Sequence, residues 1–347
     1  MRPSFAVSPA AYRGGYAGAA VLRRADPARL QTLAGRTMGT TWSLVFDNPA
    51  MLPRETLNAA VGAALDRVIA QMSTWEPLSD ISRYNTAEPG SRHVLKAEFA
   101  EVLGCALHWA EASGGAIDPT VGPLVALWGF GAHAAARALP SQDALDAAKS
   151  CTRWQRLAFD AGTGADAGSV CQPGGFSLDL SGVAKGFAVD HAVDALRSLG
   201  LQNLLMEVGG ELRGVGRRPD GSPWRVRVDG AGAHAPTVAL ADLAVATSGD
   251  RWHVRAEDGR RLSHTIDPRS GEPVASSLVS GLASVTVLHA QCMQADALAT
   301  VLTVLGETEG RAFADRHGIA ALFVCREAIA SDARRLIATQ AWRALVD

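Results

Sequence analysis

The pattern of apolar and polar residues changes abruptly between positions 176 and 200. Up to residue 181, apolar and polar side chains alternate, which is the two-residue period of a half-buried strand. The alternating positions are Phe176, Ser177, Leu178, Asp179, Leu180 and Ser181. From Val183 onward, apolar residues recur every three or four positions, at Phe187, Val189, Val193, Leu196 and Leu199. The pattern therefore predicts a strand, a short turn, and a helix that stops at Gly200.

The turn between this strand and helix has the composition of an anion site. Ser181 and Gly182 are small enough for a ligand to approach the backbone, and Lys185 stands in the first helical turn. A helix N-terminus also has unpaired N–H groups, so these features together favour a phosphate group. The turn is neither a Walker P-loop nor a G-x-G-x-x-G loop. Taken alone, it is explained equally well as a plain junction with a solvated Lys185.

The same two periodicities predict further elements along the chain. Helices are expected at about Arg54–Met72, Ala97–Ser113, Ser141–Lys149 and Met293–Leu305, the last one stopping at Gly306. Strands are expected at the end of Arg36–Phe46 and at Arg156–Asp160, Leu204–Val208, Trp224–Asp229, Val238–Ala246 and Leu282–Leu288. Arg251–Arg255 and Leu262–Ile266 predict a hairpin closed by Asp258-Gly259, and lesser elements follow near Thr308–His317 and Ala320–Cys325.

Strands and helices in this prediction do not alternate strictly along the chain. An α+β class is therefore expected, with mixed or antiparallel sheets and packed helices. One segment, Ala116–Gly131, combines large apolar residues with two prolines and three glycines. That composition argues against a regular helix or a central strand, so we expect an ordered loop shaped against another part of the protein.

Asp296 and Thr300 form a second candidate site on the predicted helix near residue 300. Because they are four positions apart, both side-chain oxygens lie on the same helix face. A carboxylate and a hydroxyl can supply two hard oxygen ligands to Mg²⁺, with waters or phosphates completing its shell. An alternative is that Asp296 is simply an acidic residue favoured near a helix N-terminus.

His264 lies at the end of the predicted hairpin, three residues before the Asp267-Pro268 pair. A histidine at this position could act as a general base near neutral pH. The chain has nine histidines, however, and a surface or hydrogen-bonding role explains one of them equally well. Met38, Trp75 and Tyr84 could likewise be core residues or the walls around a flat aromatic ligand.

Composition limits the function in three ways. The chain has 347 residues, 48% of them hydrophobic, so it can bury a substantial core. Its net charge of −2 gives no reason to expect nucleic acid or an anionic membrane as a partner. Its five cysteines are widely spaced without a C-x-x-C motif, which favours free thiols over disulfides or a zinc site.

The first 34 residues are rich in Ala, Gly, Arg and Pro, and we interpret them as a loose leader before one domain at 35–347. Their apolar run, Ala17–Leu22, is too short for a signal-peptide core, and no lipobox cysteine follows. Elsewhere no stretch approaches the ~18 apolar residues that a membrane span needs. These features predict a soluble, cytoplasmic protein.

Eight ordered motifs make the chain resemble the ApbE family of FAD:protein FMN transferases, from about Gly35 nearly to the C-terminus. They are Arg36–Thr40, Met72–Trp75, Ile117–Leu124 with Leu127–Gly131, Asp179–Gly186, Val208–Gly210, Thr247–Gly249, Ser263–Pro268 and Ala295–Thr300. The resemblance implies an ApbE-like, T-fold-like flavin transferase fold. It also implies an enzyme that uses Mg²⁺ and FAD to attach FMN to a threonine hydroxyl of an acceptor flavoprotein, releasing AMP. Many family members are exported and lipid-anchored, which leaves the compartment open.

The resemblance also implies roles for individual residues. FAD would contact Met38, Trp75, Ala116, Ile117, Asp118, Asp179, Lys185 and Ile266. The metal would be held by the Gly182 carbonyl and the side chains of Asp296 and Thr300. His264 would be the base that takes the threonine proton, and Lys185 would neutralise the diphosphate. Asp118 and Asp179 would orient the adenine and ribose rather than act as bases.

Two alternative functions are compatible with the same residues. If water replaced the threonine, the enzyme would be an FAD pyrophosphatase that yields FMN and AMP. A non-catalytic FAD-binding or carrier protein is the other alternative. It is disfavoured because storage of a flavin needs neither a metal nor a base, whereas Lys185, His264, Asp296 and Thr300 provide for both.

Overall fold

The computed structural model describes residues 30–132, 139–162, 168–228, 235–249, 254–257, 260–276, 281–326 and 334–346. Its helices are α1 (Arg54–Met72), α2 (Asp80–Asn85), α3 (Ala97–Ala112), α4 (Gly122–Leu127), α5 (Gln142–Ser150), α6 (Ala184–Ser198), α7 (Cys292–Arg316) and α8 (Gln340–Val346), with a 3-10 turn at Trp154–Arg156. Its strands are β1 (Leu30–Thr37), β2 (Thr40–Asp47), β3 (Arg92–Val94), β4 (Phe159–Asp160), β5 (Ser169–Cys171), β6 (Leu204–Val208), β7 (Glu211–Val215), β8 (Trp224–Arg227), β9 (Thr237–Leu240), β10 (Leu243–Gly249), β11 (Val254–Glu257), β12 (Arg260–Asp267), β13 (Glu272–Ser276), β14 (Gly281–His289), β15 (Ala320–Arg326) and β16 (Arg334–Ala338).

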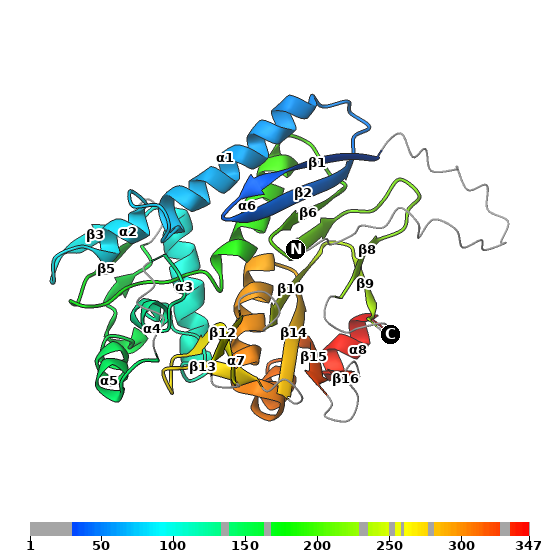
Figure 1. The fold of residues 1–347 in the computed structure, drawn as a ribbon. Helices are drawn as coiled ribbons and strands as arrows, with labels where there is room; N and C mark the ends of the chain where they lie inside the picture. Colours follow the sequence, from blue (N-terminus) through cyan, green and yellow to red (C-terminus); the bar gives the residue numbers. More distant parts are fainter. Residues whose placement is uncertain are drawn as a thin grey trace.

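An eight-stranded sheet with the order β1-β2-β6-β7-β10-β14-β15-β16 forms the centre of the fold. Each neighbouring pair in it is antiparallel. Smaller sheets are formed by β11-β12-β13, by β3-β5-β4 and by β8-β9. In Figure 1 the long helices α1, α6 and α7 lie along one side of the large sheet, and β8, β9 and α8 lie on the other. The α+β class with antiparallel sheets and packed helices is therefore confirmed.

Both faces of the central sheet are buried, and the alternation along β6 shows how. Leu204, Met206 and Val208 point into the large core between the sheet and helices α1, α3, α6 and α7. Leu205 points into the second core, where Trp224 of β8 and Trp342 of α8 cover the opposite face. All five residues of β6 are consequently buried, as expected for a central strand with a layer on each side.

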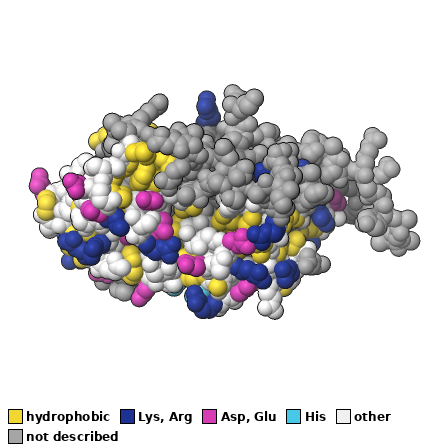
Figure 2. Space-filling view, turned by 60° about the horizontal axis from the view of Figure 1, so that its bottom comes forward, with side chains coloured by type: hydrophobic (Ala, Val, Ile, Leu, Met, Phe, Trp, Pro, Cys, Tyr) yellow, Lys and Arg dark blue, Asp and Glu magenta, His cyan; other side chains and the backbone are white. Residues whose placement is uncertain are grey.

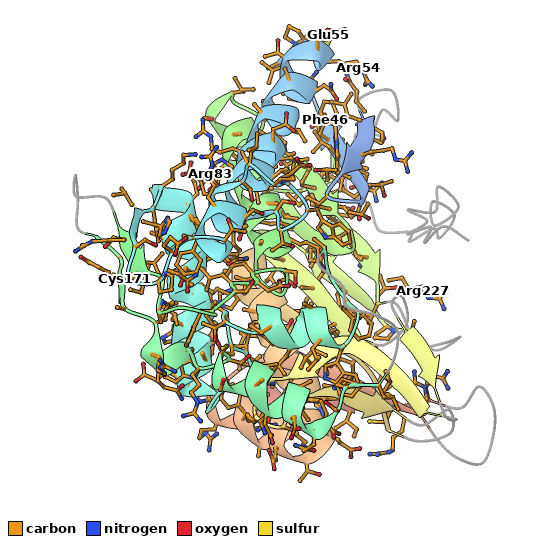
Figure 3. All side chains as sticks on the ribbon, turned by 60° about the vertical axis from the view of Figure 1, so that its left-hand side comes forward. Phe46, Arg54, Glu55, Arg83, Cys171 and Arg227 are labelled. Atoms are coloured by element: carbon orange, nitrogen blue, oxygen red, sulfur yellow. The ribbon has the colours of Figure 1, made fainter. Side chains whose placement is uncertain are left out.

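Helix α1 is attached to the edge of the sheet at its first turn. The Arg54 guanidinium donates hydrogen bonds to the Gln31 side chain at 3.2 Å and to the Thr32 carbonyl at 2.7 Å. Figure 3 shows Arg54 and Glu55 at this end of the helix, close to β1 and to Phe46 of β2. Among the described residues, no helix is long and apolar enough to cross a membrane.

Several elements were predicted within a residue or two of their observed bounds. Helix α1 has the predicted limits, α3 ends before Gly114-Gly115, and α6 ends at Leu199 with Gly200 in the left-handed region at φ 95°. Gly306 also has non-helical angles inside α7, so the predicted helix before it and the element after it are both confirmed. Strands β11 and β12 form the expected antiparallel pair, but residues 251–253 and the turn at 258–259 lie outside the described residues.

The predicted strand at residues 176–181 is wrong as a regular strand, although its alternation is correct. Leu178 and Leu180 are buried while Ser181 is exposed, but only one bridge, Val121 to Ser177, links this segment to another. The Asn85 side chain replaces a neighbouring strand here. Its amide donates to the Leu178 carbonyl at 2.9 Å, and its oxygen accepts from the Leu178 N–H at 2.7 Å. The segment is therefore extended without belonging to a sheet.

The segment Ala116–Gly131 was predicted to be free of regular helix, and this is wrong for six residues. Helix α4 covers Gly122–Leu127, with Pro123 in its first turn. A proline is tolerated there because the first N–H groups of a helix have no intrahelical partner. The rest of the segment is an ordered loop, as expected, and its Trp128 indole donates to the Gly271 carbonyl at 2.7 Å.

Other boundaries also differ from the prediction. The strand expected at Val238–Ala246 is two strands, β9 and β10, with Asp242 between them at a positive φ of 56°. The strand expected at Arg156–Asp160 is reduced to β4, because Trp154–Arg156 forms a 3-10 turn. Residues 30–34, assigned to the leader, pair with β2 as part of β1. Residues 1–29 lie outside the described residues.

Helices α6 and α7 run antiparallel in close contact and cap each other's N-termini. Asp190 of α6 accepts the Cys292 N–H at 3.0 Å on one oxygen and the Met293 N–H at 2.9 Å on the other. Asp296 of α7 accepts the Gly186 N–H at 2.9 Å in return. Each carboxylate satisfies backbone donors at the start of the other helix, where no intrahelical acceptor exists. This exchange fixes the helices' register as well as their distance.

Gly186 permits the close approach of these two helices. A Cβ atom on residue 186 would lie 2.3 Å from the Cys292 carbonyl oxygen and 2.8 Å from the Asp296 Cβ. The first of these atoms belongs to the backbone of α7, so a rotamer change could not relieve the clash. On the face shown in Figure 2, basic and acidic side chains are interspersed over the described part of the surface.

We predict that Gly186→Ala destabilises the protein by about 2 kcal/mol, because overpacking a helix contact forces backbone movement. Gly62→Ala is the matched control, since a Cβ at this interior position of α1 would meet nothing within 4 Å. That change should stabilise by about 0.5 kcal/mol through helix propensity. Urea unfolding of both variants measures the difference, and equal effects would contradict the close contact.

We predict that Asp190→Ala lowers the free energy of unfolding by about 3 kcal/mol. The change removes the cap of α7 and also leaves the Arg213 guanidinium without the carboxylate that it contacts at 2.7 Å. Asp194→Ala, on the exposed side of the same helix, should change it by no more than about 0.5 kcal/mol. Denaturant titration followed by circular dichroism compares the two variants; a small effect at Asp190 would show that the cap is dispensable.

Candidate functional site

The antiparallel packing of α6 and α7 brings together the three residues predicted to hold a metal. Asp190 meets Cys292, Gly186 meets Asp296 one turn earlier on α6, and the next pair in this series is Gly182 with Thr300. A Cβ on residue 182 would lie 3.1 Å from the Thr300 Oγ1. Gly182, Asp296 and Thr300 are therefore neighbours, although more than a hundred residues separate the first from the other two.

The Gly182 carbonyl is open to an external ligand. In a regular helix it would accept the Gly186 N–H, but that group donates to the Asp296 Oδ2 instead. Among the described residues, no backbone N–H donates to the Gly182 oxygen. Asp296 thus acts as a cap and, by doing so, leaves a carbonyl free beside its own carboxylate.

Lys185 lies in the first turn of α6 and forms an ion pair with Glu211 at the start of β7. The Lys185 side chain is 35% exposed, whereas that of Glu211 is 3% exposed. The ammonium therefore lies between a buried carboxylate and the open side of the site. Burial alone would lower the pKa of Lys185, but the attraction of Glu211 and Asp296 raises it, so the lysine stays charged.

Three buried carboxylates, Glu207, Glu211 and Asp296, surround this single lysine. Burial raises the pKa of Glu211 to about 7, with Lys185 opposing and Asp296 adding to the shift. Burial also raises the pKa of Asp296, against the effects of Lys185 and the Gly186 N–H. It raises the pKa of Glu207 too, although Gly210, Ser43 and Lys185 oppose the shift. The site thus carries more negative charge than its lysine balances, which favours a bound cation.

The residues present fit a hard divalent cation. A carboxylate, a hydroxyl and a free carbonyl supply the oxygen ligands that Mg²⁺ prefers, and waters or phosphates normally complete its shell. Within the described ranges, no group of three or more His, Cys, Asp and Glu side chains is arranged to hold a metal. The predicted set is consistent with this, because Asp296 is its single carboxylate.

Met38 lies at the tight turn between β1 and β2, with a positive φ of 47°. This turn is next to the Gly209-Gly210 turn between β6 and β7. The Gly209 N–H donates to the Thr41 carbonyl at 3.0 Å, and a Cβ on residue 209 would lie 3.0 Å from Thr40 and 3.7 Å from the Glu211 carboxylate. Met38 is half-buried against the main core and close in sequence to this junction.

The Ala116–Asp118 segment packs beside the strand-like segment that precedes Gly182. The Asp179 N–H donates to the Pro119 carbonyl at 2.9 Å. Asp179 itself accepts the Ser181 N–H at 2.9 Å, which shapes the turn into α6. Ala116 and Ile117 are buried, so contact with a ligand would have to come through their backbone or edges.

Asp118 is 4% exposed and both of its carboxylate oxygens are engaged. One accepts the Thr120 N–H at 2.7 Å and the Thr120 hydroxyl at 2.6 Å, and the other accepts the Trp154 N–H at 3.1 Å. Burial raises the pKa of Asp118 in spite of these hydrogen bonds. The geometry gives Asp118 a structural role in holding the loop, beside which its expected FAD contact stays a prediction.

His264 and Ile266 are on β12, which contacts both α7 and α4. His264 is exposed, in a stretch where the pairing of β12 with β13 shifts register between Leu262 and Ile266. Ile266 is buried in a small core with residues of α4 and α5, including Leu124 and Trp128. Such irregular strand positions redirect side chains, and they often occur next to functional sites.

Trp75 is the one predicted contact that the structure leaves away from the others. It lies between α1 and α2 with 69% of its surface exposed, next to Leu78, which is 77% exposed. No described contact joins its ring to the cluster around Lys185. Its proposed interaction with FAD stays a prediction.

The sequence reasoning missed Glu211, Glu207 and Asp190. Glu207 accepts the Gly210 N–H at 2.9 Å and the Ser43 hydroxyl at 3.2 Å, so it supports the turn that presents Glu211. A signal existed for Glu211, since a glutamate directly after Gly209-Gly210 interrupts an apolar stretch. Asp190 lacked such a signal, because it lies on the polar face of a predicted helix.

Comparison with known proteins agrees with this geometry. A profile of the ApbE family matches residues 38–323. An FAD:protein FMN transferase of Vibrio cholerae is 36% identical over 306 residues, which are 86% of this chain and 89% of the relative. Another from Haemophilus influenzae is 33% identical over 303 residues, covering 85% of this chain and 86% of the relative.

Solved structures are also similar over nearly the whole length. The apo crystal structure of the flavinyl transferase ApbE of Pseudomonas stutzeri gives a TM-score of 0.82 at 37% identity, covering 91% of this chain and 96% of that one. The ApbE protein of Thermotoga maritima gives 0.77 at 26% identity, covering 92% and 99%. With the profile covering most of its length, the chain belongs to the ApbE family.

Proposed function

We propose that this protein is an FAD:protein FMN transferase that uses Mg²⁺ and attaches FMN to a threonine hydroxyl of an acceptor flavoprotein. The observation that carries the proposal is the convergence of Gly182, Lys185, Asp296 and Thr300 at one place. Two relatives named FAD:protein FMN transferase, at 36% and 33% identity, support the same reaction. Oxygen ligands next to an exposed ammonium are the groups that cleavage of a diphosphate requires.

In the proposed reaction the threonine oxygen attacks the phosphorus of the FMN half of FAD. The new phosphoester bond forms as the bond to the AMP half breaks, and AMP leaves. His264 takes the hydroxyl proton, and Lys185 lies where it can balance the charge that collects on the leaving phosphate. Gly182, Asp296 and Thr300 would hold Mg²⁺, which supplies Lewis-acid stabilisation of the diphosphate when bound.

The acceptor distinguishes this function from hydrolysis of FAD. Purified protein is incubated with FAD and Mg²⁺, with an acceptor flavoprotein carrying the target threonine or with the same acceptor after Thr→Val. Transfer predicts a covalently fluorescent acceptor and release of AMP only with the intact threonine. AMP release at equal rates in both incubations would support a pyrophosphatase, and tight FAD retention without AMP would support a carrier.

We predict that Asp296→Asn and Thr300→Val each lower transfer at least about 100-fold, because each removes an oxygen ligand. Asparagine can still accept the Gly186 N–H, so the helix contact is kept. Thr303→Val is the control, since Thr303 lies on the same helix with a buried hydroxyl that has no hydrogen-bond partner. The assay is in-gel flavin fluorescence across a Mg²⁺ titration. Full activity of Asp296→Asn would remove Asp296 from the proposed metal site.

We predict that His264→Ala slows transfer about 100-fold or more while FAD affinity changes less than about threefold. A general base contributes to the rate of the chemical step rather than to binding of the nucleotide. His108→Ala, at an exposed histidine of α3, should leave both quantities unchanged. Single-turnover transfer and flavin fluorescence titration measure them separately. Weakened FAD binding with a normal rate would make His264 a binding residue.

A further inference from the structure

Glu211 is the residue closest to the reaction that the proposed mechanism does not use. It begins β7, directly after the Gly209-Gly210 turn, and its side chain is almost completely buried. One carboxylate oxygen, Oε1, accepts a hydrogen bond from the Lys185 ammonium. The other, Oε2, is buried with no hydrogen-bond partner among the described residues. The hydrogen bonding of this carboxylate is therefore directed at Lys185.

The arrangement restricts a side chain that would otherwise be mobile. A lysine has four rotatable side-chain bonds, and fixing its ammonium costs roughly 1.5–2 kcal/mol in rotamer entropy. Lys185 reaches the site from α6, while Glu211 approaches from β7 on its buried side. The ion pair leaves the other donors of the ammonium pointing to the more exposed side. A phosphate could bind there without first having to order the lysine.

The neighbouring glutamate, Glu207, is held in a different way. Its two oxygens accept hydrogen bonds from the Gly210 N–H and from the Ser43 hydroxyl. Lys185 influences Glu207 through its charge, but the hydrogen bond of the ammonium goes to Glu211. The two glutamates are similarly buried at opposite ends of one tight turn, so they differ mainly in whether they bond to Lys185.

We propose that Glu211 is a positioning residue that fixes the Lys185 ammonium for the FAD diphosphate. The inference rests on the proposed function, since it assigns Glu211 a part in the same reaction. Glu211 does not contact the nucleotide and acts through Lys185. Its removal should therefore matter only while Lys185 is present.

A double-mutant cycle tests this dependence. The variants are Lys185→Met, Glu211→Gln and the double variant, with Glu207→Gln alone and combined with Lys185→Met as the matched control cycle. For each protein, the transfer kcat and KM, the Kd for FAD with Mg²⁺, and the thermal unfolding midpoint are measured. Glu211→Asp is added because it keeps the charge but is one methylene shorter, so it remains informative if Glu211→Gln folds poorly.

We expect Glu211→Gln to lower kcat/KM about tenfold to a hundredfold in the native background and less than about threefold beside Lys185→Met. Glu211→Asp should retain part of the loss-free activity because the charge remains. Glu207→Gln should have the same effect in both backgrounds. Lys185→Met should unfold at a lower temperature than the double variant, since it leaves a buried carboxylate unpaired.

Two results would overturn the assignment. One is an equal effect of Glu211→Gln with and without Lys185, which would make its role independent of the lysine. The other is a raised Mg²⁺ requirement for Glu211→Gln in the Lys185→Met background, which would make Glu211 a metal ligand. Failure of the proposed function looks different: the unaltered protein would then show no transfer to any threonine-bearing acceptor, whatever the cycle gives for FAD binding and unfolding.

Discussion

The antiparallel contact of α6 with α7 is the constraint on which the rest of the site depends. Asp190 and Asp296 exchange caps between the two helix N-termini, and Gly186 lets the backbones approach closely enough for both. The next turn of the same contact places Gly182 against Thr300. Since a carboxylate fits a helix start in only one register, the caps that stabilise the fold also align the oxygen atoms of the site.

The charges at this contact cannot be understood as a stability device alone. Three buried carboxylates around one lysine raise one another's pKa values, which is costly unless a cation is bound or protons are taken up. Proteins keep such groups where the charge is used, and a divalent ion with a diphosphate would complete the set. Membership in the ApbE family gives this electrostatic pattern its chemical meaning.

Parts of the fold that depend on local pattern were predicted well. The limits of α1, the stop of α6 at Gly200 and the break at Gly306 follow from apolar periodicity and glycine, which act within a few residues. The errors arose where distant residues replaced a local partner. Leu178 satisfies its backbone through the Asn85 side chain instead of a strand, and β7 has a glutamate whose partner is on α6.

The sequence by itself determined the α+β class, the family resemblance and the identity of the candidate oxygen ligands, because residue types, spacing and motif order are properties of the chain. It placed Asp296 and Thr300 on one helix face, since four residues make about one turn. Only the tertiary structure decided that Gly182 meets Thr300, that Asp118 holds its own loop, and that Glu211 pairs with Lys185. These contacts join residues tens to more than a hundred positions apart, or depend on which hydrogen-bond partner is within reach, and neither is encoded in a local period.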